Sequence, residues 1–341
     1  MTSAAAAGVY MLSGNPKPAA QNGRIAFAGI NLAGAEFGNL LGKHSKDYIY
    51  PGREQIGYYA DLGFNLVRIP CKWERLQPAL GEPLQERELA LLSQAVAQAR
   101  AHRATAVLDP HNFGGRSLLE ENWRTGHLIG SPKVSTGVFA DFWGRLAAAF
   151  LHQPDVIFGL MNEPAGLEAR DWLAIANAGI RAIRQTGARN LILVPGVAYT
   201  GAHSWLSSGN TAMQDVEDPA QNFILEVHQY LDSDSSGTHD EAVSPTIGSE
   251  RIKNFVDWAR ERKLRALLGE FGASKDTQSC AALEDLCRSI HANPDVWLGW
   301  AAWAGGAWWP EDYRFNLGPP KNGGLRPQTR ILSAFARSIK A

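Results

Sequence analysis

The sequence predicts a single-domain (β/α)8 barrel, in which eight parallel strands close into a ring surrounded by helices. Strand-like apolar runs recur eight times along the chain, and helical patterns separate them. Their starts lie roughly 30 to 50 residues apart, about the length of one strand–helix unit. Two of the runs, Val156–Leu160 and Ala266–Leu268, are almost entirely apolar, which is typical of strands buried on both faces in a parallel sheet.

The predicted elements follow from these patterns in chain order. The strands are Ala28–Ala33, Asn65–Pro70, Thr105–Pro110, Val156–Asn162, Asn190–Gly196, Phe223–Tyr230, Arg265–Gly269 and Trp297–Trp303. The helices are Glu86–His102, Val138–His152, Leu167–Thr186, Ser249–Arg262, Cys280–Ala292 and Pro327–Ile339. Because small polar residues cap helix N-termini, Ser135 or Thr136 is expected to start the second helix. Ser249, followed by Glu250, is expected to start the fourth.

The chain is expected to form one domain of residues 23–341, preceded by an arm of residues 1–22 that lies on or caps the bottom of the barrel. An open doubly wound sheet is the alternative fold, but no glycine-rich phosphate loop follows the first strand. Residues 1–8 lack the basic region and the hydrophobic centre of a signal peptide.

Composition excludes several classes of partner. The formal net charge is −1, without a long run of one sign, whereas nucleic acids and anionic membranes require basic patches. The apolar runs are shorter than a membrane span. Of the three cysteines, Cys280 and Cys287 lie too far apart along a helix to form a disulfide. Free thiols are therefore expected, and a bridge stays open only if Cys280 precedes the helix.

Polar residues gather where the predicted strands end. In barrels of this kind the C-terminal ends of the strands carry the catalytic groups. A single polar residue at a strand end is usually a structural hydrogen-bond partner, but six strands contribute such residues to the same end. They are Arg68, His111, Asn112, Asn162, Glu163, His228, Tyr230, Glu270 and Trp303. The sequence therefore predicts a catalytic site.

Two glutamates indicate the chemistry. Glu163 and Glu270 directly follow the fourth and seventh predicted strands, so they approach the mouth from different sides. Glycoside hydrolysis uses such a pair, in which one carboxyl group gives a proton to the leaving oxygen and the other attacks the anomeric carbon. Arg68 and Tyr230, if they reach Glu270, would favour it as the ionised nucleophile.

The remaining tip residues suit supporting roles. Asn162 can bind the 2-hydroxyl of a sugar. His111 and His228 can orient groups, move protons or bind sugar. A metal site is disfavoured because the histidines lack His-x-x-x-His spacing and lie three strands apart, so neither a metal nor another cofactor is predicted.

At these residues the chain resembles glycoside hydrolase family five, a group of retaining (β/α)8 enzymes dominated by endo-β-1,4-glucanases. Asn162-Glu163-Pro164 is similar to the acid/base motif of that family, and Gly269-Glu270-Phe271-Gly272 to its nucleophile motif. Arg68, His111, Asn162, His228, Tyr230 and Trp303 match the other positions around its cleavage site. Segments 34–38, 201–205 and 231–239 resemble a cellulase subgroup of fungi and bacteria.

The resemblance, which spans Ala28 to about Trp309, implies double displacement with carboxyl groups about 5 to 5.5 Å apart. It implies a β-glucan substrate, and the expected protein is a secreted monomer. Trp303 would form the floor of the subsite that holds the distorted sugar, and Trp205 would stack on a sugar on the leaving side. Contacts on the opposite side are expected from Trp308, Trp309, Glu36 and Asn31, unless these are packed loop residues, and Asn112 is also expected to bind substrate.

Eleven tryptophans is a high number for this length. Those in helical segments are expected to pack in the core: Trp73, Trp123, Trp143, Trp172 and Trp258. Alternatives to the cellulase interpretation remain open. A mannanase, a xyloglucanase or a β-1,3-glucanase would share the catalytic tips, and a non-catalytic carbohydrate-binding barrel would share the fold. A metal-dependent hydrolase is disfavoured by the missing ligand cluster.

Overall fold

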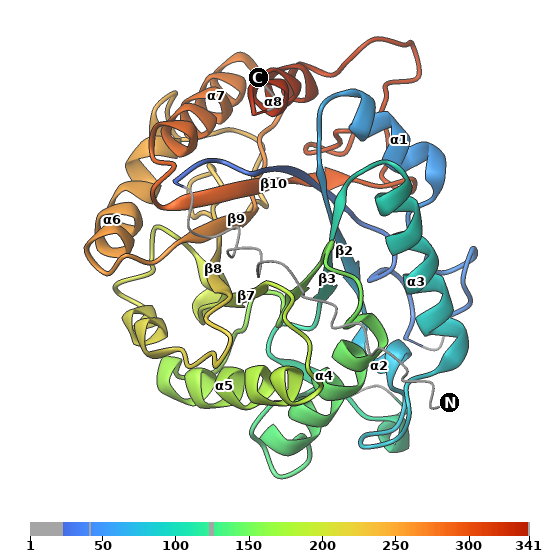
Figure 1. Ribbon diagram of the computed structural model, residues 1–341. Coiled ribbons are helices and arrows are strands. Elements are labelled where there is room, and N and C mark those ends of the chain that lie inside the picture. Colours follow the sequence, from blue (N-terminus) through green and yellow to red (C-terminus); the bar gives the residue numbers. More distant parts are fainter. Residues whose placement is uncertain (1–22, 41, 123–125, 340–341) are drawn as a thin grey trace, which may run out of the picture.

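A closed ring of eight parallel strands lies at the centre of the molecule (Figure 1). The computed structural model describes residues 23–40, 42–122 and 126–339, so the predicted arm of residues 1–22 lies outside the described residues. The predicted (β/α)8 barrel is confirmed. Around the ring the strands are β1 (Phe27–Leu32), β10 (Trp297–Gly305), β9 (Ala266–Glu270), β8 (Phe223–His228), β7 (Ile192–Pro195), β6 (Val156–Gly159), β3 (Thr105–Pro110) and β2 (Leu66–Cys71), which pairs again with β1.

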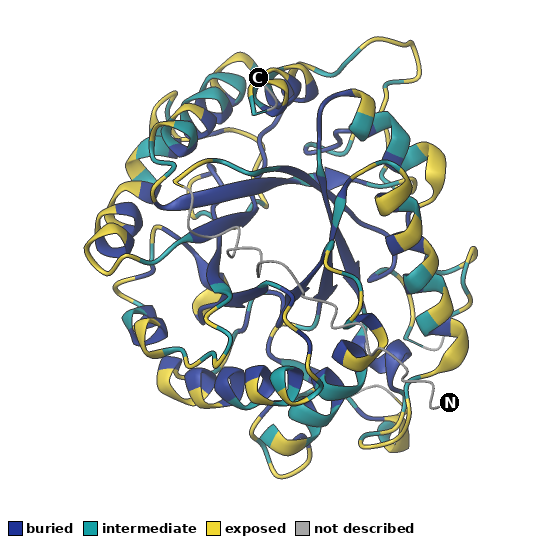
Figure 2. Ribbon diagram, viewed as in Figure 1, coloured by how far each residue is buried: buried dark blue, intermediate teal, exposed yellow. Residues whose placement is uncertain are grey.

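Helices surround the ring, and their buried residues face it (Figure 2). They are α1 (Arg53–Asp61), α2 (Trp73–Leu76), α3 (Glu86–Ala101), α4 (Thr136–Phe150), α5 (Ala169–Gln185), α6 (Ile247–Glu261), α7 (Thr277–Ala292) and α8 (Pro327–Ser338). The six predicted helices are confirmed to within three residues at each end. The sequence did not reveal α1, which carries a glycine and two adjacent tyrosines and so has low intrinsic helix propensity.

Several short elements were also not predicted. The antiparallel pair of β4 (Gly115–Ser117) and β5 (Gly126–Leu128) follows β3, and short 3₁₀ helices occur at η2 (Leu119–Glu121), η3 (Ala198–Thr200) and η4 (Asn210–Asp215). Strand β6 ends at Gly159, three residues before the predicted end at Asn162. Elements this short carry too few residues for a periodic pattern.

One of the two predicted helix starts is confirmed. Ser135 caps α4 by accepting a hydrogen bond from the Val138 amide at 3.4 Å. Ser249 does not start α6, which begins two residues earlier, at Ile247. The Ser249 amide instead donates to the Asp285 carboxylate of α7 at 2.7 Å. A side chain from a neighbouring helix thus takes over a capping role that local sequence cannot reveal.

The core has two layers, one between the ring and the helices and one inside the ring. The outer layer contains Trp73, Trp143, Trp172 and Trp258, as predicted, whereas Trp123 lies outside the described residues. The cysteines are free thiols, with Cys280 inside α7. The inner layer draws side chains from seven of the eight strands: Leu66, Val107, Ile157, Leu193, Ile224, Leu267, Leu298 and Ala301.

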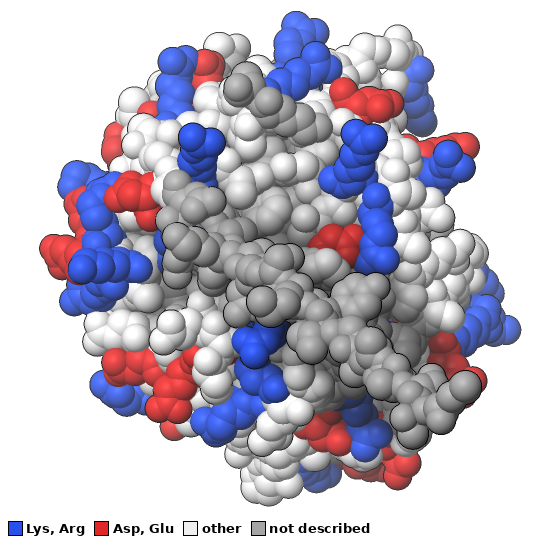
Figure 3. Space-filling model, in the orientation of Figure 1, with Lys and Arg blue, Asp and Glu red and all other residues white. Residues whose placement is uncertain are grey.

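Charged side chains of both signs lie on the surface of the described residues. On the face shown in Figure 3, basic and acidic side chains of the described residues are interspersed. Within the described part of the chain, no helix has the length and apolar character needed to cross a membrane.

Candidate active site

A polar layer lies inside the barrel, directly after the apolar inner layer. Side chains alternate between faces along a strand, so residues two positions after an inward-facing residue also point inward. On β2, β3 and β8 these positions hold Arg68, Asp109 and Glu226, each at most 1% exposed. On β9 the position is Gly269, where an added Cβ would lie 2.3 Å from Oε1 of Glu226. The glycine therefore leaves the space that the Glu226 carboxylate needs.

Arg68 joins this polar layer to the strand tips. Its guanidinium forms ion pairs with Asp109 at 3.0 Å, Glu226 at 2.9 Å and Glu270 at 2.8 Å. It also donates to Asn31 at 2.9 Å and to Asn162 at 2.8 Å. A guanidinium presents five N–H donors in a fixed planar arrangement, so one fully buried side chain can hold all these groups at once.

Glu270 is the last residue of β9 and accepts hydrogen bonds at both carboxylate oxygens. Oε1 accepts from Arg68, and Oε2 accepts from the Tyr230 hydroxyl at 3.1 Å. Both contacts predicted for Arg68 and Tyr230 are therefore present. They fix the carboxylate and leave it 4% exposed at the end of the barrel.

Glu163 lies beyond the end of β6 with a left-handed backbone, at φ 43°. The segment around it is tied to β3 and its loop, because the Asn162 amide donates to the Pro110 carbonyl and the Ala165 amide to the Phe113 carbonyl. Left-handed backbone is unfavourable for a residue with a Cβ and persists where the surroundings enforce it. The turn directs the Glu163 side chain toward His228, whose Nδ1 lies 2.7 Å from Glu163 Oε1.

The two glutamates lie close together. One carboxylate oxygen of Glu163, one ring nitrogen of His228 and one carboxylate oxygen of Glu270 all lie within 4.8 Å of one another. One carboxylate oxygen of Glu163 is therefore less than 5 Å from one of Glu270. The two carboxyl groups of inverting glycosidases are farther apart, about 6.5 to 9.5 Å, to admit a water molecule.

His228 carries a positive charge in this arrangement. Burial alone would lower its pKa, but the carboxylates of Glu270, Glu163 and Glu226 outweigh burial and raise the pKa to about 10. Burial raises the pKa of Glu270, and the positive charges of His228 and Arg68 oppose that rise. Two buried cations thus lie among the carboxyl groups of the site.

His111 is neutral and couples the polar layer to Asn162. Burial lowers the pKa of His111 well below its ordinary value. Its Nδ1 lies 2.8 Å from Asp109 Oδ2, and its Nε2 lies 3.2 Å from Asn162 Nδ2. Since the amide nitrogen can only donate, the proton of the neutral ring is on Nδ1 and points at Asp109. Burial raises the pKa of Asp109 to about 7, although Arg68 opposes the rise.

Two groups of side chains in the described residues have the spacing of metal ligands: Glu163, His228 and Glu270, and Asp232, Asp234 and His239. In the first group, His228 bonds to Glu163, and Glu270 accepts from Arg68 and Tyr230. In the second group, the Asp232 oxygens already accept hydrogen bonds from the backbone amides of residues 237–239. Hydrogen bonding within the protein therefore accounts for both groups.

Aromatic side chains border the strand tips on one side. Trp303 stacks on His111, with ring centroids 5.6 Å apart, and donates to the Tyr313 hydroxyl at 3.0 Å. Trp309 stacks on Tyr313 at 4.0 Å, and Trp308 is 37% exposed. Trp303, and Trp309 with its ring centroid 6.1 Å from that of Trp303, therefore lie beside the strand tips. Contact of the three tryptophans with sugar stays a prediction.

Comparison with known families identifies the one to which this barrel, with its two glutamates at the strand ends, belongs. A family profile described as Cellulase (glycosyl hydrolase family 5) matches residues 24–306. The chain belongs to glycosyl hydrolase family 5. As a member of family 5 it is a glycoside hydrolase.

Individual relatives of this family 5 chain agree with the assignment. An endo-beta-1,4-glucanase A of Emericella nidulans is 37% identical over 321 residues, which cover 93% of this chain and 94% of that protein. Among solved structures, an endo-beta-1,4-glucanase from Xanthomonas axonopodis pv. citri is 44% identical, with a TM-score of 0.88 and coverage of 92% and 99% of the two chains. XacCel5A in complex with cellopentaose is also 44% identical, with a TM-score of 0.86 and coverage of 91% and 98%.

Two residues predicted to bind sugar in this family 5 chain are buried instead. Trp205 has no exposed surface and packs edge-on against Phe255, with ring centroids 5.1 Å apart, and against Trp258. Asn31 is also fully buried, where it accepts from Arg68 and donates to the Gly269 and Ala301 carbonyls. Both predictions are wrong, because packing or hydrogen bonding inside the protein occupies these side chains.

Glu36 and Asn112 line a pocket of about 550 Å³ beside the tips, together with Lys72, Phe113 and the β4–β5 pair. The side chain of Asn112 already forms hydrogen bonds within the protein, because it accepts from the Trp73 amide and donates to Glu74. Glu36 accepts from the Gly34 amide through Oε2 only, and burial raises its pKa to about 8. Its second oxygen has no partner in the protein, so the predicted contact with a sugar hydroxyl stays open.

Sequence reasoning missed two residues of the site and gave a third no role. Asp109 was recognised only as part of the third predicted strand and its tip, and Glu226 was overlooked inside a strand, although each interrupts an apolar run at an inward-facing position. Tyr199 was also missed. It follows β7, is 60% exposed, and its amide donates to the Pro164 carbonyl at 3.3 Å. Tyr199, and not Trp205, is therefore the exposed aromatic residue in the segment that follows β7.

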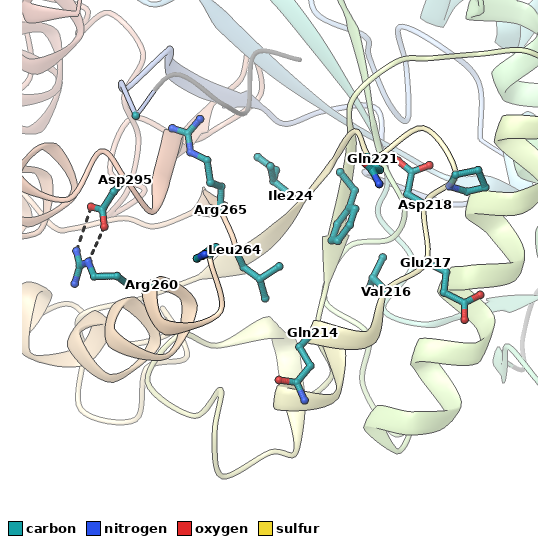
Figure 4. Close-up of a pocket in the computed structure, with 14 residues that line it drawn as sticks. Gln214, Val216, Glu217, Asp218, Gln221, Ile224, Arg260, Leu264, Arg265 and Asp295 are labelled. Carbon is teal, nitrogen blue, oxygen red and sulfur yellow. Dashed lines mark hydrogen bonds and ion pairs between the residues drawn. The ribbon is translucent and has the colours of Figure 1, made fainter. Parts of the chain in front are cut away.

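A further cavity lies at the other end of the barrel (Figure 4). It has a volume of about 1060 Å³ and is bordered by Phe223 and Arg265, which lie at the starts of β8 and β9, and by the ion pair of Arg260 and Asp295. The starts and ends of parallel strands lie at opposite ends of a barrel, so this cavity is remote from the two glutamates.

Proposed function

We propose that the protein is a retaining endo-β-1,4-glucanase, with Glu163 as acid/base and Glu270 as nucleophile. The observation that carries the proposal is the separation of less than 5 Å between carboxylate oxygens of the two residues. This spacing suits direct attack on the anomeric carbon and leaves no room for a water molecule on the far side of the sugar.

Hydrogen bonding supports the division of roles. Glu270 accepts from the Arg68 guanidinium and from the Tyr230 hydroxyl, which favours the ionised form that a nucleophile needs. Glu163, on the tip beyond β6, is left for the role of acid/base.

The mechanism then proceeds in two displacements. Glu163 protonates the leaving oxygen while Glu270 attacks the anomeric carbon and forms a glycosyl-enzyme. Glu163, now ionised, accepts a proton from the water that releases the sugar, and the anomeric configuration is retained. The Asn162 side-chain amide has two hydrogens, and one of them points at His111. Through the other hydrogen, the amide can donate to the sugar 2-hydroxyl. Trp303 provides the apolar floor beside it.

The names of the relatives support a β-1,4-glucan as the substrate. Those of Emericella nidulans and Xanthomonas axonopodis are named endo-beta-1,4-glucanases, and XacCel5A binds cellopentaose. We accordingly propose internal cleavage of cellulose and related β-glucans by a monomer that acts outside the cell, where the polymer is found. Neither a nucleic acid nor a membrane is part of the proposed function.

Product analysis on cellopentaose, with NMR of the newly formed anomer, tests substrate and stereochemistry together. The β-anomer is expected first, and an initial α-anomer would refute retention. Initial rates on carboxymethylcellulose, mannan, xyloglucan and laminarin separate the enzymes that share this scaffold. EDTA should leave the rate unchanged, and a rate that falls and returns with added metal would contradict the proposed chemistry.

Variants test the two roles separately. Glu163→Ala should abolish cellopentaose hydrolysis but still form the glycosyl-enzyme from an aryl cellobioside, whose leaving group needs no protonation. Azide should then rescue turnover and yield a β-glycosyl azide. Glu270→Gln should be inactive on both substrates. Glu88→Gln is the matched control, since this buried carboxylate binds Tyr48 and Tyr50, outside the site. Equal losses in Glu163→Ala on both substrates would refute its role.

A further inference from the structure

The loop of residues 231–239, which follows β8, is folded around one buried carboxylate. Asp232 is 3% exposed. Its Oδ1 accepts from the Gly237 amide at 3.0 Å, and its Oδ2 accepts from the Thr238 and His239 amides at 3.1 Å each. Burial by itself would raise the pKa of Asp232, but these amides outweigh burial and lower the pKa, so the carboxylate is ionised. Three charge-assisted hydrogen bonds therefore hold residues 237–239 in place.

The folded loop brings Gly237 onto the ring of Tyr230. A Cβ added at Gly237 would lie 2.7 Å from Cδ1 of Tyr230 and 2.9 Å from both Cγ and Cε1. Nearly equal distances to three consecutive ring atoms mean that the glycine lies over the face of the ring. The ring also stacks on Phe315, with centroids 5.6 Å apart and an interplanar angle of 19°.

The backbone of Tyr230 is held as well. Arg251 and Gln229 each donate to the Tyr230 carbonyl at 2.7 Å. With the carbonyl and the ring both held, the hydroxyl has little freedom to leave Glu270, to which it donates at 3.1 Å. A side chain in that position must be locked by packing to keep a hydrogen bond in productive geometry.

We propose that Gly237 and Asp232 are positioning residues for the nucleophile, acting through the Tyr230 hydroxyl. Position 237 requires glycine for two reasons. Its φ of 71° is left-handed, and any Cβ would collide with the Tyr230 ring. The inference rests on the proposed function, because it assumes that Glu270 is the nucleophile and that the Tyr230 hydroxyl supports it.

A double-mutant cycle between Gly237→Ala and Tyr230→Phe tests the proposal. Tyr230→Phe alone should lower kcat on cellopentaose about 10- to 100-fold, the range expected for a lost hydrogen bond to a charged group. Gly237→Ala should cause a similar loss with little change in KM. In the Tyr230→Phe background, Gly237→Ala should cost less than about twofold, because the hydroxyl through which it acts is already gone.

The pH profile provides a second readout that loss of stability alone would not move. The acid limb of kcat/KM reports the pKa of Glu270 in the free enzyme. Both single variants should shift this limb to higher pH, since the carboxylate loses a donor, and the double variant should shift it no further. Asp232→Asn, which loosens the loop without adding bulk, should act in the same direction and serves if Gly237→Ala does not fold.

Gly81→Ala is the matched control. Gly81 has nearly the same backbone conformation, at φ 76°, but an added Cβ meets nothing within 4 Å. It should lose stability only, with kcat and the acid limb unchanged. Equal losses from Gly237→Ala in both backgrounds, or full activity in Gly237→Ala, would overturn the positioning role. Full activity of Tyr230→Phe or Glu270→Gln would instead refute the proposed function itself.

Discussion

Glu226→Gln offers a sharp test of how the buried charges interact. Glu226 lies in the polar layer with its carboxylate 2.9 Å from Arg68 Nε and 3.5 Å from His228 Nε2. Glutamine has nearly the same shape, so the substitution removes one negative charge from the interior without opening a cavity. We expect the pKa of His228, now raised to about 10, to fall.

The distance sets the size of the effect. Two unit charges 3.5 Å apart interact by about 5 kcal/mol at an effective dielectric constant of about 20, equivalent to about 3.5 pKa units. Glu226 also pairs with Arg68, which weakens its effect on His228. A fall of about 2 units is therefore expected, to a pKa of about 8.

Nitrogen-detected NMR titration of the imidazoles measures this directly, with the His228 signal assigned by its loss in His228→Gln. Glu88→Gln is again the control and should leave the titration unchanged. A second effect follows, because Glu226 and Glu270 both pair with Arg68, and loss of the Glu226 charge leaves more of the guanidinium charge to stabilise ionised Glu270. The acid limb of kcat/KM should move to lower pH. A His228 pKa that moves by less than about half a unit would refute the proposed network.

Three further predictions follow from the site and the core. Tyr199→Ala should raise KM for cellopentaose several-fold, as expected for about 1 kcal/mol of ring contact, but leave kcat for an aryl cellobioside unchanged; an unchanged KM would exclude Tyr199 from the leaving side. Trp205→Ala should lower the free energy of unfolding by about 3 to 5 kcal/mol, because it empties a buried site. Denaturant unfolding measures this, and a raised KM without lost stability would restore the stacking role. His228 has its pKa raised in the folded state from 6.5 to about 10, so its stabilising contribution is complete below pH 6.5 and is lost as the pH rises toward 10. The melting temperature of the wild type, compared with that of His228→Gln, should show an advantage that shrinks over this range; an advantage that grows would contradict the sign of the shift.

The fold and the strand tips were accessible from sequence because their signals are local. A strand buried on both faces is an apolar run, and a helix on the outside of a barrel repeats its apolar positions every three to four residues. Both patterns are complete within one element. Strand order then determined that Arg68, Glu163, His228 and Glu270 face the same end of the ring, without any knowledge of distances.

The errors arise where a residue's environment depends on other elements. Trp205 and Tyr199 both follow β7, and nothing local distinguishes the buried ring from the exposed one. The difference comes from α6, whose Phe255 and Trp258 cover Trp205. Asn31 likewise looks available at the end of its strand until Arg68 is placed beside it. Exposure of a loop aromatic or a strand-end amide is thus a tertiary property.

The polar layer below the tips sets the charge around the two glutamates. Without Asp109 and Glu226, the charges of Arg68 and His228 would act on Glu163 and Glu270 alone. Two cations beside two carboxyl groups favour ionisation of both, which does not suit an acid. Glu226 pairs with both Arg68 and His228, and Asp109 pairs with Arg68, so part of the cationic charge is drawn into the barrel. In the proposed mechanism, the acid therefore depends on carboxylates that never touch the sugar.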